Sequence, residues 1–145
     1  MINIKSNGIL SVTKLISKVF SILCNNNIDT NYISQASSDY NLCLTVNILE
    51  TDKVIELLNL GLEYEIKKNI IRSITSRKDI ALIAVIGHNM ISNIGIAGKI
   101  LSLLGNNDIN IISMTQGSSE ISISFIVNLE YEYKALNVIH DNFII

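Results

Sequence analysis

The chain has 145 residues, of which 48% are hydrophobic and 17% are charged, a composition typical of a folded globular protein and not of a disordered one. Its formal net charge is −2, which argues against nucleic acid or an anionic membrane surface as a partner, because both attract a basic excess. No apolar stretch approaches the roughly 20 residues of a membrane-spanning helix. Residues 1–5 show no secretory signal, so we expect a cytoplasmic protein.

The spacing of apolar residues predicts the elements of the first half of the chain. Between Leu15 and Leu23 they recur at intervals of three and four, as on one face of a helix. Between Tyr40 and Val46 every second residue is apolar, which indicates a strand with one buried face. The predicted elements are a strand at 2–6, a helix around 15–23, strands at 28–34 and 40–46 joined by a turn at 36–38, a helix around 54–58 and a strand near 63–67.

The second half of the chain repeats this pattern. Residues 4–47 align without gaps with residues 85–128 at a fixed offset of 81, which places Gln116 on Gln35. Each copy has the order of a ferredoxin-like βαββαβ fold, in which two helices cover one face of an antiparallel sheet. In the second copy the predicted elements are a strand at 80–86, a helix around 96–104, strands at 109–115 and 121–127 joined by a turn at 117–119, and a helix around 135–139.

The second copy has no residues left for its last strand. We therefore predict an α+β protein with a complete domain at 1–70 and a domain at 78–145 that lacks one strand. An unpaired sheet edge is usually filled by another segment or subunit, so we expect the chain to be part of something longer.

The side chains that could support catalysis or bind a metal are few. Cys24 and Cys43 are the only cysteines and form no CxxC motif, which favours neither a disulfide framework nor a zinc site. His88 and His140 have no apparent carboxylate partner in the sequence. We predict no catalytic residue, no metal and no cofactor.

The most informative segment lies at 92–98, Ser-Asn-Ile-Gly-Ile-Ala-Gly, where the second copy's first helix begins. Free amides and the helix dipole favour a carboxylate there, and Gly95 allows a small ligand to approach the backbone. The carboxamides of Gln35 and Gln116, at the ends of equivalent strands, offer a donor and acceptors to such a ligand. Alternatively, both glutamines satisfy only backbone groups of their hairpins.

Several of these segments resemble the tandem ACT domains at the C-terminus of aspartate kinase, over nearly the whole chain. The match is most specific in Gln-Gly-Ser-Ser-Glu at 116–120 and looser at 33–40. The presence of glutamine at the equivalent position of both copies most resembles the pattern of the threonine-responsive kinases, including those fused to homoserine dehydrogenase. The other segments that carry the resemblance are 81–87, 94–99, 109–111 and 121–124.

The resemblance implies a regulatory part that binds threonine or lysine and transmits feedback inhibition to an amino-terminal kinase, which phosphorylates the β-carboxylate of aspartate. The kinase's Lys-Phe-Gly-Gly motif is not in this sequence, so we expect no phosphotransferase activity from this chain alone. In the family, a strand that precedes the first ACT domain completes the second sheet. Tandem ACT copies in this family also pair side by side into a continuous sheet, so the resemblance implies that two chains form a homodimer.

The resemblance also implies an effector site where one copy faces the other. Where the family usually has Pro-Gly at the first helix start, this sequence has Thr13-Lys14, so the second copy is the better candidate. A different hypothesis is an ACT pair with degenerate sites that serves mainly for dimerisation. The residues that match the family pattern are Ser11, Lys14 and Gln35 in the first copy and Asn93, Gly95, Asn110, Ile111 and Gln116 in the second.

Overall fold

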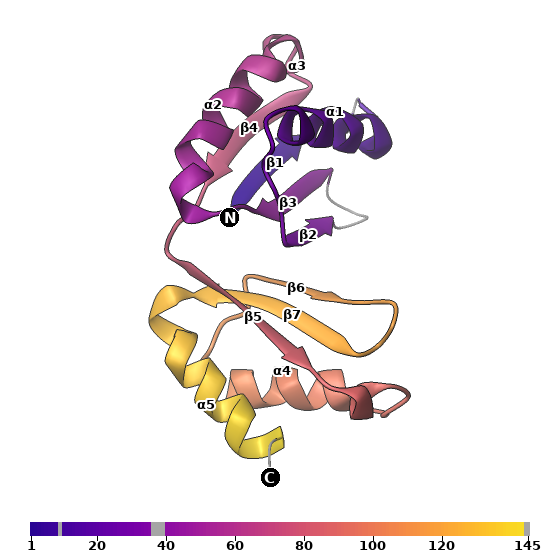
Figure 1. Ribbon diagram of the computed structural model, residues 1–145, viewed down its shortest axis with the longest axis vertical. Helices are drawn as coiled ribbons and strands as arrows, with labels where there is room; N and C mark the ends of the chain where they lie inside the picture. Colours follow the sequence, from indigo (N-terminus) through magenta and orange to yellow (C-terminus); the bar gives the residue numbers. More distant parts are fainter. Residues whose placement is uncertain (9, 36–39, 144–145) are drawn as a thin grey trace. The chain divides into compact units, whose positions relative to one another are not determined.

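Two separate hydrophobic cores divide the chain into the units Met1–Lys78 and Asp79–Ile145 (Figure 1). The structure is a computed structural model that describes residues 1–8, 10–35 and 40–143. In each unit, two helices pack against one face of an antiparallel sheet. The predicted α+β class and the repeated ferredoxin-like order are confirmed.

The first unit has a four-stranded sheet in the order β2-β3-β1-β4. The central strands β1 and β3 pair antiparallel, with Ile2 opposite Leu44 and Ile4 opposite Leu42. The elements are β1 (Ile2–Ser6), α1 (Val12–Asn25), β2 (Tyr32–Gln35), β3 (Asn41–Thr45), the 3-10 turn η1 (Ile48–Glu50), α2 (Thr51–Gly61), α3 (Glu63–Lys67) and β4 (Ile71–Ser76).

The core of the first unit follows the predicted periodicities. Ile2, Ile4, Leu42 and Leu44 are each at most 1% exposed, because alternate residues of a strand share one face. The buried residues of α1 are spaced by four along its apolar stripe. The helix ends at Asn25, and Asn27 takes the left-handed conformation with φ of 53°, which asparagine tolerates better than most residues.

The strand predicted near residues 63–67 is wrong, because these residues form helix α3. Leu62 is completely buried between α2 and α3, and the buried carboxylate of Glu65 pairs with the ammonium of Lys18 on α1. Glu and Lys also favour a helix. Asn69, at φ of 59°, then turns the chain into β4, the sheet's actual edge strand.

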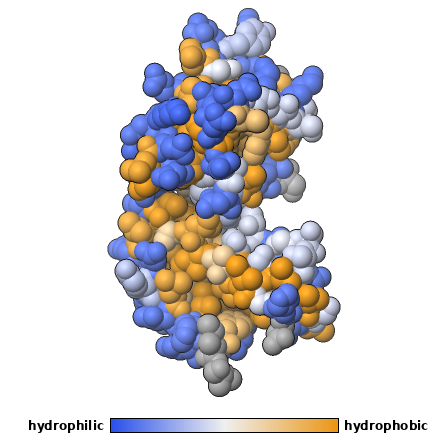
Figure 2. Space-filling view, viewed as in Figure 1, coloured by the Kyte–Doolittle hydropathy of each residue, from blue (hydrophilic) through white to orange (hydrophobic). Residues whose placement is uncertain are grey.

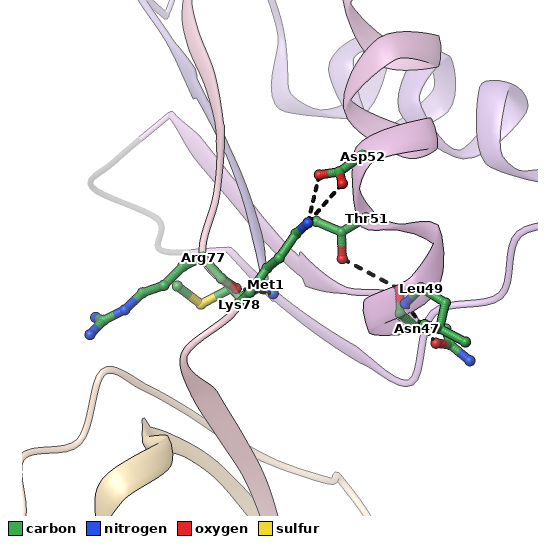
Figure 3. A network of polar contacts seen from close by, with 7 residues as sticks. All are labelled: Met1, Asn47, Leu49, Thr51, Asp52, Arg77 and Lys78. Carbon is green, nitrogen blue, oxygen red and sulfur yellow. Dashed lines mark hydrogen bonds and ion pairs between the residues drawn. The ribbon is translucent and has the colours of Figure 1, made fainter.

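A polar network stabilises the start of α2 in the first unit (Figure 3). The Asn47 side chain accepts a hydrogen bond from the amide of Leu49 at 3.0 Å, and the hydroxyl of Thr51 donates to the Asn47 carbonyl at 3.4 Å. The Lys78 ammonium lies 2.8 Å from the Asp52 carboxylate. These contacts fix the first turn of the helix and tie it to the residues that follow β4.

The second unit has three described strands in the order β5-β7-β6, one fewer than the first unit, as predicted. Its core contains Phe125, Ile123 and Val127 from β7, all fully buried, against Ile100 and Leu104 of α4. The elements are β5 (Ile80–Ile86), the 3-10 turn η2 (His88–Met90), α4 (Ile96–Asn106), β6 (Ser113–Gln116), β7 (Ser122–Asn128), the 3-10 turn η3 (Leu129–Tyr131) and α5 (Glu132–Phe143).

The structure describes only one of the two predicted hairpin turns completely, the turn of the second unit. In the second unit, Gly117 donates to the Ser122 carbonyl at 3.2 Å and joins β6 to β7 as predicted. The corresponding turn predicted at 36–38 lies outside the described residues. No helix in the described part of the chain is long and apolar enough to cross a membrane.

Candidate functional site

The segment between β5 and α4 consists of two consecutive tight turns. Asn93 donates its amide to the Met90 carbonyl at 3.2 Å, and its own carbonyl accepts from Ile96 at 3.4 Å. Ser92 is the third residue of the first turn and has φ of 57°, and Asn93 is shared by both turns. Met90, only 5% exposed, anchors the segment in the core of the second unit.

Gly95 is the N-cap of α4 and has the left-handed φ of 87°. Its carbonyl accepts a hydrogen bond from Lys99 at 2.9 Å. The amides of Ala97 and Gly98, in the first turn of the helix, donate to no atom of the described chain. Together with the helix dipole, these amides offer a carboxylate two donors and a favourable potential.

The corresponding segment of the first unit is built differently. Ser11 is the N-cap of α1 with an extended backbone, φ −61° and ψ 142°. Its carbonyl accepts from the amides of Lys14 and Leu15 at 3.0 and 3.1 Å. Lys14, at the repeat position of Gly95, is therefore an ordinary helical residue with an exposed side chain.

The structure brings Gln116 to the same end of the second sheet as Asn93 and Gly95. Gln116 is the last residue of β6 and lies opposite Ile123 of β7, while Ile86, at the end of β5, lies opposite Ser122. Gln116 is exposed, and Gln35 at the end of β2 is exposed too. Within the second unit, these three candidates therefore lie at the same end of the sheet, with β7 between β6 and β5.

Asn110 and Ile111 lie at the opposite end of β6 within the second unit. They precede Ser113, which pairs with Ile126 near the end of β7, and Ile112 donates to the Ile126 carbonyl at 2.8 Å. Asn110 is exposed, whereas Ile111 is half-buried against the core. The second unit by itself does not bring these two residues together with Gln116.

One contact at this end of the sheet involves a residue that the sequence reasoning did not single out. The Glu120 carboxylate, on the turn between β6 and β7, accepts a hydrogen bond from the Ser92 amide at 3.0 Å. Glu120 belongs to the specific Gln-Gly-Ser-Ser-Glu segment. That motif was the available signal, but it did not indicate which backbone group the carboxylate would meet.

A cavity of about 1030 Å³ lies between β5, the segment that follows it and α5. Its lining includes Asn93 and Gly95, the apolar side chains of Ile83 and Ile139, and Lys99. In the first unit, the equivalent place beside β1 is occupied by β4. Figure 2 shows the accompanying hydrophobic surface over the second unit, where no described strand pairs with the free edge of β5.

Other titratable groups offer little chemistry in the described part of the chain. No group of three or more His, Cys, Asp and Glu side chains gathers there as metal ligands would. His140 Nδ1 lies 3.4 Å from the Asp141 carboxylate, in an exposed pair. Cys24 is exposed and Cys43 is half-buried, and burial raises the pKa of the Cys43 thiol, which makes it less reactive.

The family model of the ACT domain matches this chain twice, at residues 2–60 and 83–143. The chain belongs to the ACT domain family. The two matches fall in the two units, and each begins at or within the unit's first strand.

Relatives of this ACT pair are aspartokinases, which confirms the resemblance noted in the sequence. The bifunctional aspartokinase/homoserine dehydrogenase of Buchnera aphidicola is 31% identical over 141 residues, which are 97% of this chain and 17% of that protein. The aspartokinase of Saccharomyces cerevisiae is 30% identical over 140 residues, 97% of this chain and 25% of that protein. This chain thus spans a quarter or less of either relative.

Solved structures with the same fold include regulatory parts of aspartate kinase. The ligand-free regulatory subunit from Thermus thermophilus matches with a TM-score of 0.82 at 23% identity, over 98% of this chain and 91% of that one. Aspartokinase III of Escherichia coli, in complex with lysine and aspartate, matches with a TM-score of 0.71 at 22% identity. That match covers 99% of this chain and 31% of the other.

Proposed function

We propose that this ACT pair is the regulatory part of an aspartate kinase and that it binds an amino acid, threonine or lysine, for feedback inhibition. The similarity to aspartokinases along almost the whole chain supports this role. Lysine is a candidate because the Escherichia coli enzyme of the same fold was solved with lysine. Threonine is a candidate because glutamine occurs in both copies, at positions 35 and 116.

The observation that carries the proposal is the unwound start of α4. Gly95 at φ of 87° leaves the amides of Ala97 and Gly98 open to a ligand, and, apart from its two chain neighbours, no described residue has an atom within 4 Å of the place where a Cβ would be. An α-carboxylate would accept hydrogen bonds from these amides, assisted by the helix dipole. Gln116, at the same end of the sheet, would bind a second polar group of the ligand.

The start of α1 is less suited to a carboxylate. There the helix begins at Val12, and Lys14 is helical where the second unit has left-handed Gly95. A side chain at this position also restricts how closely a ligand can approach the backbone. We therefore propose the second unit as the main effector site and the first as the weaker one.

The proposed partners are the kinase domain of a longer enzyme and a second copy of this chain. Small α+β modules with free sheet edges commonly bury these edges in symmetric dimers. Light scattering at tens of micromolar would test the dimer, and a monomer would contradict both this pairing and a site that depends on it. In the competing hypothesis, the pair dimerises but has lost its effector sites.

Isothermal titration calorimetry with threonine and with lysine tests the function. Gln116→Ala removes one polar contact and leaves a ligand group poorly satisfied, so we expect binding to weaken by about 1–3 kcal/mol, which is about 5- to 150-fold in the dissociation constant. Gln35→Ala is the matched control at the repeat position and should have the smaller effect. Both variants should keep the fold, because the two side chains are exposed.

Two results would contradict the proposal in different ways. If neither amino acid binds the unmodified protein or raises its melting midpoint at millimolar concentration, the dimerisation hypothesis is favoured, since a bound ligand must stabilise the folded state. If one binds but both variants keep the full affinity, the glutamines are only hairpin residues and the site lies elsewhere.

A further inference from the structure

The backbone amides of the segment before α4 have partners that differ in kind. Gly87 donates to the Ile121 carbonyl at 2.9 Å, and the amides of Met90, Ile91 and Asn93 donate to carbonyls within the segment. The Ser92 amide donates to a side chain instead, the carboxylate of Glu120, at 3.0 Å. This charge-assisted bond holds the first turn of the segment, one residue before Asn93, which both turns share.

Both residues of this contact have unfavourable backbone conformations. Ser92 has φ of 57° and Glu120 has φ of 59°, a region that residues other than glycine seldom occupy. Such conformations persist where surrounding contacts hold them. Glu120 is held because its amide donates to the Gly117 carbonyl at 2.9 Å within the turn that joins β6 to β7, so the turn determines where its carboxylate lies.

The first unit provides the alternative conformation for this segment. Ser11, the repeat equivalent of Ser92, has φ of −61°, and the helix begins at the next residue, Val12. The equivalent of Val12 is Asn93, which lies outside α4 because that helix begins only at Ile96. Ser92 is thus left-handed where its equivalent is an extended N-cap, and α4 begins three residues later in the repeat than α1.

We propose that Glu120 is a positioning residue for the effector site. Its carboxylate fixes the Ser92 amide and thereby holds Asn93 and Gly95 in the conformation that receives the amino acid, without itself contacting that ligand. This inference rests on the function proposed above. It assigns to the Glu of Gln-Gly-Ser-Ser-Glu a role in shaping the segment before α4, whereas Gln116 of the same motif binds the ligand.

The test compares Glu120→Ala, Glu120→Gln and the control Glu130→Ala in the full chain. The glutamine variant keeps an acceptor for the Ser92 amide, and the control removes an exposed carboxylate elsewhere in the second unit. Two quantities are measured for each: hydrogen exchange of the Ser92 amide by NMR, without ligand, and the dissociation constants for threonine and lysine by calorimetry. Thermal melting reports whether each variant remains folded.

In Glu120→Ala we expect the Ser92 amide to exchange about tenfold faster or more, because it loses one hydrogen bond to a charged group. We expect the dissociation constant of the bound amino acid to rise by up to the same factor. Glu120→Gln should recover most of both quantities, and Glu130→Ala should change neither. The melting midpoints should stay within a few degrees of the unmodified protein, because the contact is exposed.

The possible failures are distinguishable. If the unmodified protein binds neither amino acid, the function proposed above fails, while the exchange measurement still reports on the contact. Unchanged exchange of the Ser92 amide in Glu120→Ala would overturn the positioning role. The same holds if exchange accelerates but affinity is unchanged, or if Glu120→Gln binds as weakly as Glu120→Ala.

Discussion

The first helices of the two units occupy the same place in the repeat but begin differently. The offset of 81 residues places Val12 on Asn93 and Lys14 on Gly95. α1 starts at Val12, whereas α4 starts at Ile96 after a left-handed glycine. Gly95 accepts a positive φ, whereas lysine, the residue at the equivalent position 14, is strongly disfavoured in that conformation. This one difference fits the later start of α4.

The same two helices also differ at a conserved position of the repeat, Lys18 and Lys99. The Lys18 ammonium pairs with the buried Glu65 carboxylate on α3. Lys99 instead donates to the Asn142 carbonyl at 3.1 Å and lies 4.4 Å from the centroid of the Phe143 ring. One lysine therefore neutralises a buried charge, and the other makes weaker contacts at an exposed site.

The largest effect on stability that we predict comes from removing the first of these two lysines, with removal of the second as the comparison. Lys18→Met should destabilise the first unit by about 2–4 kcal/mol, because it leaves the Glu65 carboxylate buried without a neutralising cation. Lys99→Met should cost the second unit less than about 1 kcal/mol, the worth of an exposed cation–π contact. Urea unfolding, followed by hydrogen exchange of amides in each unit, measures both values, and equal costs would contradict the comparison.

The ion pair should also make the first unit sensitive to acid. Burial alone would raise the pKa of Glu65, but its hydrogen bond and attraction to Lys18, with a backbone hydrogen bond, lower it below the ordinary 4.5. A lowered folded pKa contributes stability above about pH 4.5 that is lost as the pH falls through the lower value. Unfolding free energies measured between about pH 6 and pH 3 should therefore fall for the first unit.

Lys18→Met is the matched control for this pH dependence. Without the ammonium, burial becomes the dominant influence and raises the pKa of Glu65, so acidification should then relieve the buried charge and stabilise the variant relative to neutral pH. A variant that loses stability with the same pH profile as the unmodified protein would show that other carboxylates cause the acid sensitivity.

The smallest predicted effect concerns the left-handed glycine. Gly95→Ala should cost the second unit about 1 kcal/mol, because alanine is strained at φ of 87°, although its Cβ would come within 4 Å of no described residue beyond its two chain neighbours. Lys14→Ala, at the same repeat position within α1, should be neutral to within about 0.5 kcal/mol. Thermal unfolding of both variants tests this, and an equal loss at position 14 would show that the cost is not conformational.

The periodicities predicted the fold well because they report burial. Leu42 and Leu44 of β3 are buried, as the alternation between Tyr40 and Val46 predicts, and so are the apolar residues of α1 that are spaced by four. Residues 63–67 were predicted as a strand because a short segment with few apolar residues has no clear period. Its helical conformation depends on the partners of Leu62 and Glu65, which are distant in sequence.

The sequence by itself determined the repeat, the order of elements apart from α3, the family and the candidate residues Gly95 and Gln116, since each follows from local patterns or from the offset between the copies. Only the tertiary structure decided that α4 begins at Ile96, that Gln116 shares an end of the sheet with Gly95 while Asn110 does not, and that Glu120 contacts Ser92. These features depend on strand register and on contacts between residues far apart in the chain, whose energies no local pattern contains.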